Sequence, residues 1–305
     1  MDAKQELFAR LEYLDAAVGL PQVIDEGIVP STHNGVANLL RKGLGIVAFN
    51  ILEDYIKNRS KEALKFLSES GILFERLTDS LQRAAITGVL AALSTRAGLL
   101  QRAGEDWKAL VQDESLKIHS TKNSPFEISP YSFFSINSNI NASEIPDLLA
   151  AFGIAGGWGL LKSVSDQIGG GLPDLAQAYK NAADRRNRAA HTASFRYDYQ
   201  WLQGVKNEIL AIAASFDILL TARCRQIEGN LGIPIADHNI RQALNFRFLE
   251  QNGIAFKEKT QINGPARKNW TSVDQAIIIL LPRPRQNNSF LIVLDDTRRI
   301  NDWRT

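Results

Sequence analysis

The run DRRNRAAHTASFRYD at residues 184–198 brings four arginines, an amide and a histidine close together in the sequence. Arg186 and His191 are five positions apart, so on an unbroken helix they stand about 140° apart around the axis and about 7.5 Å apart along it. Asn187 and His191 are four apart and share a face. Two arrangements bring the arginine and the histidine together. Either the helix gives way near Ala190–Thr192, or two copies of the segment meet across a dimer axis.

These side chains suit the cleavage of RNA without a metal ion. A neutral imidazole can take the proton of the 2′-hydroxyl, and neighbouring cations keep the imidazole neutral near pH 7. A guanidinium can bind two non-bridging phosphate oxygens, and an amide such as Asn187 can orient the histidine or the phosphate. The alternative is a helix end whose charges face water, and the run by itself favours that alternative.

Composition limits the other function classes. The chain has 305 residues, of which 45% are hydrophobic and 22% charged, as in soluble proteins of one large domain or two ordinary ones. A net charge of +2 requires any basic site to come from local clustering. One cysteine and four histidines without metal-ligand spacing predict neither an internal disulfide nor a metal site, and we expect no cofactor.

The charged N-terminal stretch lacks the apolar core of a signal peptide, and the longest apolar windows are too short and interrupted to span a bilayer. We therefore expect a cytoplasmic protein with no membrane partner.

The first two thirds of the chain predict helices. Apolar residues recur at three-to-four spacing, and turn-forming residues separate the segments. Thr78 or Ser80, and later Ser143, are candidate N-caps, and Gly229 is a candidate C-terminal cap. The predicted helices are 38–59, 78–102, 105–118, 143–153, 156–171, 172–191 and 196–230, with an ordered aromatic loop at 119–141.

The character of the chain changes after Gly229. We expect a helix at 237–253, followed by strands at 254–260, 274–282 and 289–296, with a turn at 283–288 between the last two. The fold class is therefore mainly α, with a helical domain at 1–230 and a small α+β extension at 231–305.

The segment RNRAAH resembles the motif of the HEPN superfamily, an arginine followed by four to six residues and a histidine. Arg186-Asn187 fits the form with a polar residue after the arginine, whereas Arg185 fits only a longer spacing. The segment SINSNINASEIPDLLAAFGI upstream is similar to the RiboL-PSP and MAE-type HEPN subfamilies. The likeness covers residues 36–228, and it departs at AAHTAS, which lacks the His-Gly pair frequent in relatives.

The resemblance implies a HEPN-like helical bundle and a metal-independent endoribonuclease, often a toxin or antiviral-defence effector. Its site would be composite, formed by a homodimer, with Arg186 and His191 catalytic and Asn187 assisting. The implied partners are an RNA substrate, a second copy of the chain, and an antitoxin or defence-system protein.

Several other residues are candidates with structural alternatives. Glu53 is predicted to hold the motif arginine, or else to lie on a solvated face or pair with Lys57. Tyr197 is predicted to stack on a base, or else to pack at the start of a long helix. Three arginines are predicted to bind the RNA backbone, or else to be plain surface charge: Arg185, Arg188 and Arg196.

Two functions from other classes remain open on the sequence. One is a HEPN-like scaffold that dimerises or binds an effector without catalysis. The other is a basic nucleic-acid-binding protein in which the arginines hold phosphate without cleavage.

Overall fold

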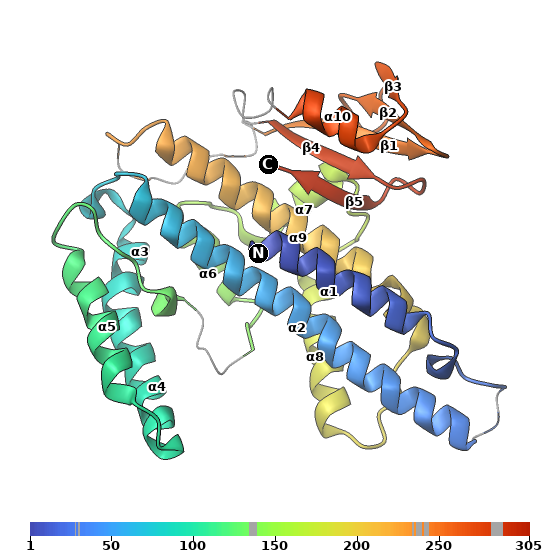
Figure 1. The fold of residues 1–305 in the computed structure, drawn as a ribbon, viewed down its shortest axis with the longest axis horizontal. Helices are drawn as coiled ribbons and strands as arrows, with labels where there is room; N and C mark the ends of the chain where they lie inside the picture. The colour runs from blue at the N-terminus through green and yellow to red at the C-terminus, as the bar shows by residue number, and fades with distance from the viewer. Residues whose placement is uncertain are drawn as a thin grey trace. The chain divides into compact units, whose positions relative to one another are not determined.

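The structure is a computed structural model (Figure 1) that describes residues 1–27, 29, 31–133, 139–233, 235, 240, 244–281 and 289–305. It confirms the predicted fold class, because nine α-helices precede a five-stranded mixed sheet in the described ranges. The chain forms two compact units. Unit 1 comprises 1–56, 161–216 and 245–305, and unit 2 comprises 57–160 and 217–244. The predicted boundary near residue 230 stays a prediction.

The helices follow the predicted segments closely, with one addition at the start of the chain. Helix α1 begins with a capping box in which Asp2 and Gln5 satisfy each other's backbone N–H groups, and it buries Leu7, Leu11 and Leu14. A π-helical turn, η3 (Ala84–Gly88), joins α3 to α4. The nine helices are α1 (Ala3–Val18), α2 (Thr32–Glu69), α3 (Asp79–Arg83), α4 (Val89–Ala103), α5 (Trp107–Ser120), α6 (Glu144–Ala151), α7 (Gly157–Ile168), α8 (Leu175–His191) and α9 (Tyr199–Glu228).

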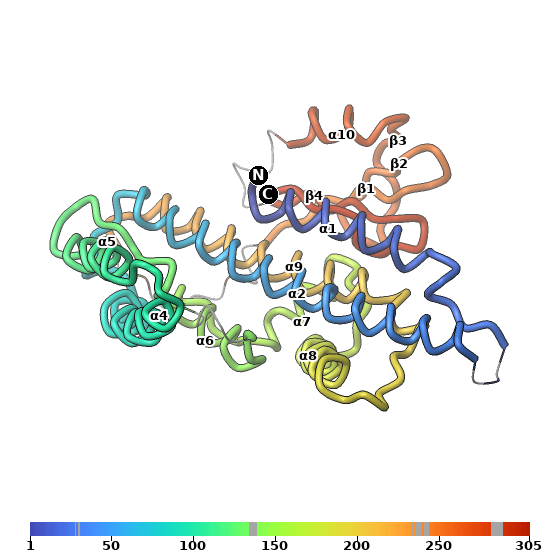
Figure 2. Tube along the Cα trace, turned by 60° about the horizontal axis from the view of Figure 1, so that its bottom comes forward, coloured from blue at the N-terminus to red at the C-terminus, as the bar shows by residue number. Residues whose placement is uncertain are grey.

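Helices α2 and α8 contact each other in unit 1. The ring of Phe49 on α2 lies 5.5 Å from that of Tyr179 on α8. Lys42, two turns earlier on α2, reaches the backbone just after α8. Figure 2 shows α8 nearly end-on beside α2. The first part of α9 completes this core, because every residue from Ile209 to Phe216 is buried.

The sheet has the strand order β3-β2-β1-β4-β5, and its β1–β4 pair is parallel. Helix α10 crosses between β3 and β4 and covers one face with a cluster of buried apolar side chains that includes Leu249, Trp270, Leu280 and Leu291. The elements of this part are β1 (Asn245–Asn252), β2 (Ala255–Lys259), β3 (Lys268–Trp270), α10 (Val273–Leu280), β4 (Ser289–Leu294) and β5 (Ile300–Arg304).

Two predictions for this part were wrong. The segment expected as a helix at 237–253 contains strand β1, because central pairing with β2 and β4 overrides its helical propensity. The segment expected as a strand at 274–282 contains α10 instead, where Ser272 caps the first turn. The predicted strands at 254–260 and 289–296 correspond to β2 and β4. The predicted turn at 283–288 lies outside the described residues.

The edge strand β5 is tied to helix α1. The Lys4 ammonium lies 2.8 Å from the Asp302 carboxylate and donates a hydrogen bond to the Trp303 carbonyl. The indole of Trp303 packs at 5.5 Å from the ring of Phe8 and at 6.4 Å from that of Tyr55. The sheet is therefore part of the same compact unit as the first helices.

Unit 2 contains a capped helix, α3, and a short network of polar side chains around Arg59. Thr78 caps α3 through the N–H of Leu81, as predicted, whereas Ser143 makes no side-chain cap bond at α6. Arg59 donates to Asp217 at 2.6 Å and to the Thr221 hydroxyl at 2.9 Å.

Among the described residues, two helical stretches are long and apolar enough to cross a membrane, namely Thr32–Glu69 and Asp79–Ala103. The criterion is length and apolar composition only, and the buried core helix of a soluble protein also meets it. In α2 the residues Phe49, Leu52 and Ile56 are buried in the protein.

Candidate active site

The motif lies at the C-terminal end of α8. Asp174 caps the start of this helix by accepting from the Gln177 N–H, and the helix continues through His191 to Thr192, which is extended. The helix gives way at Thr192, within the predicted range Ala190–Thr192, but only after the histidine. Within one protomer Arg186 and His191 stay about 140° apart around the axis.

Arg186 stands on the side of α8 that faces α2. It follows Tyr179 by seven residues, which places the two about 20° apart around the helix. It is half-buried, and its Nε is buried with no hydrogen-bond partner among the described residues. Its Nη1 donates to Asn187 Oδ1 at 3.2 Å. The guanidinium therefore keeps donors that no other described group uses.

Asn187 and His191 are both exposed, and they share one face of α8 because they are four residues apart. The structure thus presents an imidazole and an amide together to solvent. The Asn187 Oδ1 bond to Arg186 connects this face to the half-buried guanidinium. The three predicted catalytic residues form one continuous polar strip at the end of the helix.

Glu53 is buried on α2, one turn beyond Phe49, whose ring contacts that of Tyr179 on α8. A buried carboxylate needs a partner for its charge. That Glu53 holds the motif arginine stays a prediction.

Lys42 and Asn38 of α2 form hydrogen bonds with the turn after His191, and Gly45 of α2 leaves space for it. Lys42 donates to the carbonyls of Thr192 at 2.9 Å and Ala193 at 2.8 Å. Asn38 donates to the Phe195 carbonyl and accepts from the Tyr197 N–H. Gly45 leaves room for the Tyr197 ring, since a Cβ there would lie 2.1 Å from Tyr197 Cζ.

The sequence analysis did not single out Asn38 or Lys42, although an amide and a charge within an apolar helix were the available signal. Lys42 binds the carbonyls of the two residues directly after His191. We therefore infer that Lys42 and Asn38 position the C-terminal end of α8.

Tyr197 is buried against this part of α2, so the predicted stacking of its ring on a base is wrong and the packing alternative holds. Its ring lies 5.7 Å from that of Phe195 and 5.6 Å from that of Trp201. Burial raises the pKa of the Tyr197 hydroxyl, and the nearby Arg185 opposes that shift.

Arg185 points away from the exposed motif face and stacks on Trp201, with its guanidinium carbon 4.5 Å from the ring centroid. The Trp201 indole donates to both oxygens of Glu208 at 3.1 Å. Burial raises the pKa of the Glu208 carboxyl, while the indole hydrogen bond and Arg185 lower it. Arg185 therefore joins α8 to α9, which is a structural use of the residue that we expected to bind RNA.

The other two predicted RNA contacts remain at the surface. Arg188 is exposed, lies over the ring of Phe195 at 4.3 Å and approaches Asp184 at 3.8 Å. Arg196 is exposed, and the described residues give it no ion-pair partner. Both cations are available to phosphate.

The other described histidines lie elsewhere. His33 contacts the carbonyl of Ile24 at 2.9 Å, and His119 is exposed near the end of α5. His238 lies outside the described residues. Within the described part of the chain, no three His, Cys, Asp or Glu side chains form a group that could hold a metal ion.

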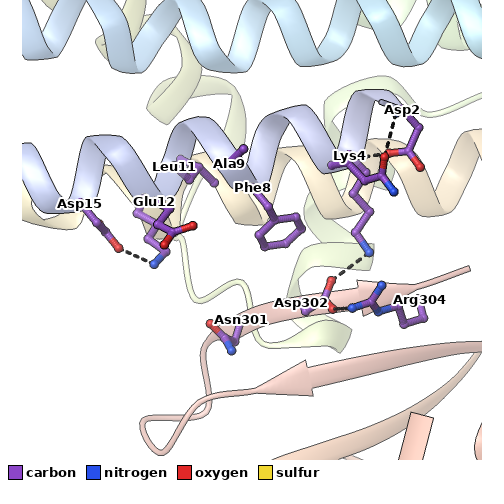
Figure 3. A pocket seen from close by; sticks show the side chains of 12 residues that line it. Asp2, Lys4, Phe8, Ala9, Leu11, Glu12, Asp15, Asn301, Asp302 and Arg304 are labelled. Atoms are coloured by element: carbon purple, nitrogen blue, oxygen red, sulfur yellow. Dashed lines mark hydrogen bonds and ion pairs between the residues drawn. The ribbon is translucent and has the colours of Figure 1, made fainter. Parts of the chain in front are cut away.

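A separate groove of about 690 Å³ lies along α1, with Lys206 of α9 and strand β5 on its sides (Figure 3). Its charges are largely paired with one another, as in Lys4–Asp302 at 2.8 Å, Arg304–Asp302 at 2.6 Å and Lys206–Asp15. None of its lining residues belongs to the motif. We assign its charges to the attachment of β5 to the helices.

Residues 20–222 match the model of the RiboL-PSP-HEPN family, which spans most of α2 to α9 and includes the motif. The chain belongs to this family. The HEPN superfamily is generally linked to ribonuclease activity, and its domains often bind RNA and dimerise. No curated protein and no solved structure shows significant similarity to this HEPN protein. The sheet at 245–305 lies outside the match.

Proposed function

We propose that this HEPN protein is a metal-independent endoribonuclease that acts through Arg186, Asn187 and His191. The observation that carries the proposal is the polar strip at the end of α8. There an exposed imidazole and amide adjoin a guanidinium with an unused, buried Nε, inside the segment matched by the family.

The proposed reaction is an internal transfer at phosphorus. Neutral His191 removes the proton of the 2′-hydroxyl, the 2′-oxygen bonds to phosphorus, and the bond from phosphorus to the 5′-oxygen breaks. The 5′-oxygen takes up a proton, leaving a 2′,3′-cyclic phosphate and a 5′-hydroxyl. Arg186 stabilises the charge that develops on the non-bridging oxygens, and Asn187 orients the groups.

The helix geometry supports a composite site. One protomer presents Arg186 and His191 on different faces of the same helix. Two copies of α8 related by a two-fold axis would bring the arginine of one to the histidine of the other. Arg188 and Arg196 supply further cations for the RNA backbone.

The biological setting is part of the proposal. The family resemblance supports a toxin or antiviral-defence effector that works in the cytoplasm, controlled by an antitoxin or another defence protein. No metal or cofactor is part of the proposed chemistry.

The test is cleavage of total RNA in EDTA by the wild type and by His191→Ala. Loss of a general base typically lowers the rate about 100- to 10,000-fold. His119→Ala is the matched control, because His119 is also an exposed histidine near a helix end. We expect the wild type and H119A to cut equally, and H191A to stay folded and inactive.

Equal cutting by the wild type and H191A would refute the assignment of His191. An RNA with a 2′-deoxy nucleotide at the cleaved position must resist the enzyme, since the nucleophile is missing. Salt-dependent RNA binding without any cleavage by the wild type would support a binding protein instead.

A further inference from the structure

Two contacts between a guanidinium and an aromatic ring lie at the end of α8, and they differ in their exposure to solvent. Arg185 lies 4.5 Å from the ring of Trp201, and Arg188 lies 4.3 Å from the ring of Phe195. Arg185 and Trp201 are half-buried, and the indole donates to Glu208. The side chain of Arg188, by contrast, is 55% exposed. The first contact therefore joins α8 to α9, whereas the second is open to a further molecule.

The ring of Phe195 is held in place from several sides. The Phe195 N–H donates to the Thr192 carbonyl at 3.1 Å, and the Phe195 carbonyl accepts from Asn38 at 3.2 Å. The ring lies edge-on to that of the buried Tyr197, with the centroids 5.7 Å apart and the planes at 75°. Phe195 thus supports the Arg188 guanidinium from a fixed position.

The outer side of this stack is available. A guanidinium that rests on a ring with one face still presents its other face and the N–H groups in its plane. The Asp184 carboxylate stands 3.8 Å from Arg188, and at that length the two exposed groups form no hydrogen bond. Three small, exposed residues precede Phe195 and leave room for a flat molecule beside the stack, namely Thr192, Ala193 and Ser194.

The stack is also adjacent to the proposed general base. Arg188 and His191 are three positions apart on α8, so their side chains are neighbours on the helix surface, with Cβ atoms about 5–6 Å apart. Side chains of a helix lean toward its N-terminus, so the imidazole leans from the last turn toward Arg188. In RNA the base and the 2′-hydroxyl are attached to adjacent carbons of one ribose. A nucleotide whose 2′-hydroxyl meets His191 therefore carries its base within reach of Arg188.

We propose that Arg188 and Phe195 form a base-binding subsite, in which the base of the nucleotide that supplies the 2′-hydroxyl stacks on the outer face of the Arg188 guanidinium. An unpaired base can stack on an arginine plane, and every base offers a flat face, so the subsite selects unpaired nucleotides without choosing among the four bases. The N–H groups in the plane of Arg188 remain available to a backbone phosphate. The inference rests on the proposed function, which places the nucleotide at His191.

The experiment measures binding by the full chain in the His191→Ala background, so that RNA is not cut. The two ligands are a single-stranded oligouridine and a sugar–phosphate chain of the same length without bases. Arg188→Lys keeps the charge but loses the planar face, and Phe195→Leu keeps an apolar side chain but loses the ring. We expect each variant to bind the oligouridine about 10-fold more weakly and the chain without bases as tightly as before. Phe195→Tyr retains the ring and should bind both ligands like the parent.

Each test variant has a matched control. Phe74→Leu is the control for F195L, because Phe74 is also half-buried and lies edge-on to another ring, with the centroids 5.4 Å apart. Arg102→Lys is the control for R188K, because Arg102 is an exposed arginine on α4 and lies outside the motif. Neither control should change the binding of either ligand, and circular dichroism must show the same helix content in all variants.

An equal loss with both ligands would mean that Arg188 contacts only the backbone, and no loss with either would mean that the stack is packing alone. Either result would overturn the subsite. A loss that requires the bases, in a protein whose wild type cuts no RNA, would leave the subsite standing and refute the proposed function. Cleavage that depends on His191, without any loss that requires the bases, would do the reverse.

Discussion

Replacing Gly45 by alanine tests whether α2 sets the position of the motif. A Cβ at residue 45 would lie 2.1 Å from Tyr197 Cζ, and carbon atoms in contact stand about 3.5 Å apart, so the ring or the helix must move by about 1.4 Å. The ring is buried and cannot turn aside freely. Such overpacking costs up to about 3 kcal/mol, and the loss of the glycine returns about 1 kcal/mol. We therefore expect a net destabilisation of about 2 kcal/mol.

The matched control is Gly204→Ala on α9, because a Cβ there meets nothing within 4 Å. This change should stabilise the protein by about 0.5–1 kcal/mol. Urea denaturation followed by circular dichroism gives both values. A Gly45→Ala protein as stable as Gly204→Ala would show that the packing of Tyr197 on α2 has been misread.

The same variant should lose activity. Tyr197 belongs to the turn that follows His191, and a displacement of about 1 Å at a reacting group can lower a rate about 100-fold. Cleavage of RNA under native conditions, at a temperature where the variant is fully folded, measures this effect. Unchanged cleavage would mean that the turn does not position the histidine.

Two further predictions concern buried titratable groups. Burial raises the pKa of Glu208 above the value of 4.5 that it has when the chain is unfolded, so the folded protein binds this proton more tightly. As the pH rises from 4.5 through the folded-state pKa, the wild type should therefore lose free energy of unfolding relative to Glu208→Gln. Urea denaturation of both proteins at pH 4.5 and at pH 7 measures this loss. Burial also raises the pKa of the Cys224 thiol to about 11, so a thiol reagent at pH 8 should react only after denaturation. Fast labelling of the native protein would contradict the packing of α9.

The helices of the motif region could be predicted because their sequences carry the signals that the structure uses. The apolar spacing of α2 and α9 and the cap at Thr78 are local features, and all appear in the structure. The placement of Asn187 and His191 on one face follows from their spacing alone. Site residues that lie close together in the sequence could therefore be predicted from the sequence alone.

The C-terminal part was harder because its local signals have two readings. The pair Asn252-Gly253 fits a helix end as well as a hairpin turn, and the structure makes it a hairpin with Gly253 at a φ of 62°. The isoleucine run of α10 has high strand propensity, but its cap and the burial of Ala276 and Leu280 make it a helix. Contacts across the sheet decide such cases, and a single sequence does not show them.

The contacts between the motif and distant segments of the chain could not be predicted, for a similar reason. Lys42 and Asn38 lie some 150 residues before the turn that they hold, as the bonds to Thr192 and Phe195 show. Nothing in the local sequence links these segments.

The link between α1 and β5 has a consequence for the order of events during synthesis. Lys4 contacts Trp303, and unit 1 combines segments that include residues near both of these positions. Contacts so far apart in the chain form late, because a long loop must close first. The helices around the motif therefore lack part of their packing until residue 303 has left the ribosome. A nascent chain carries the motif long before it carries the strand that completes the unit around it.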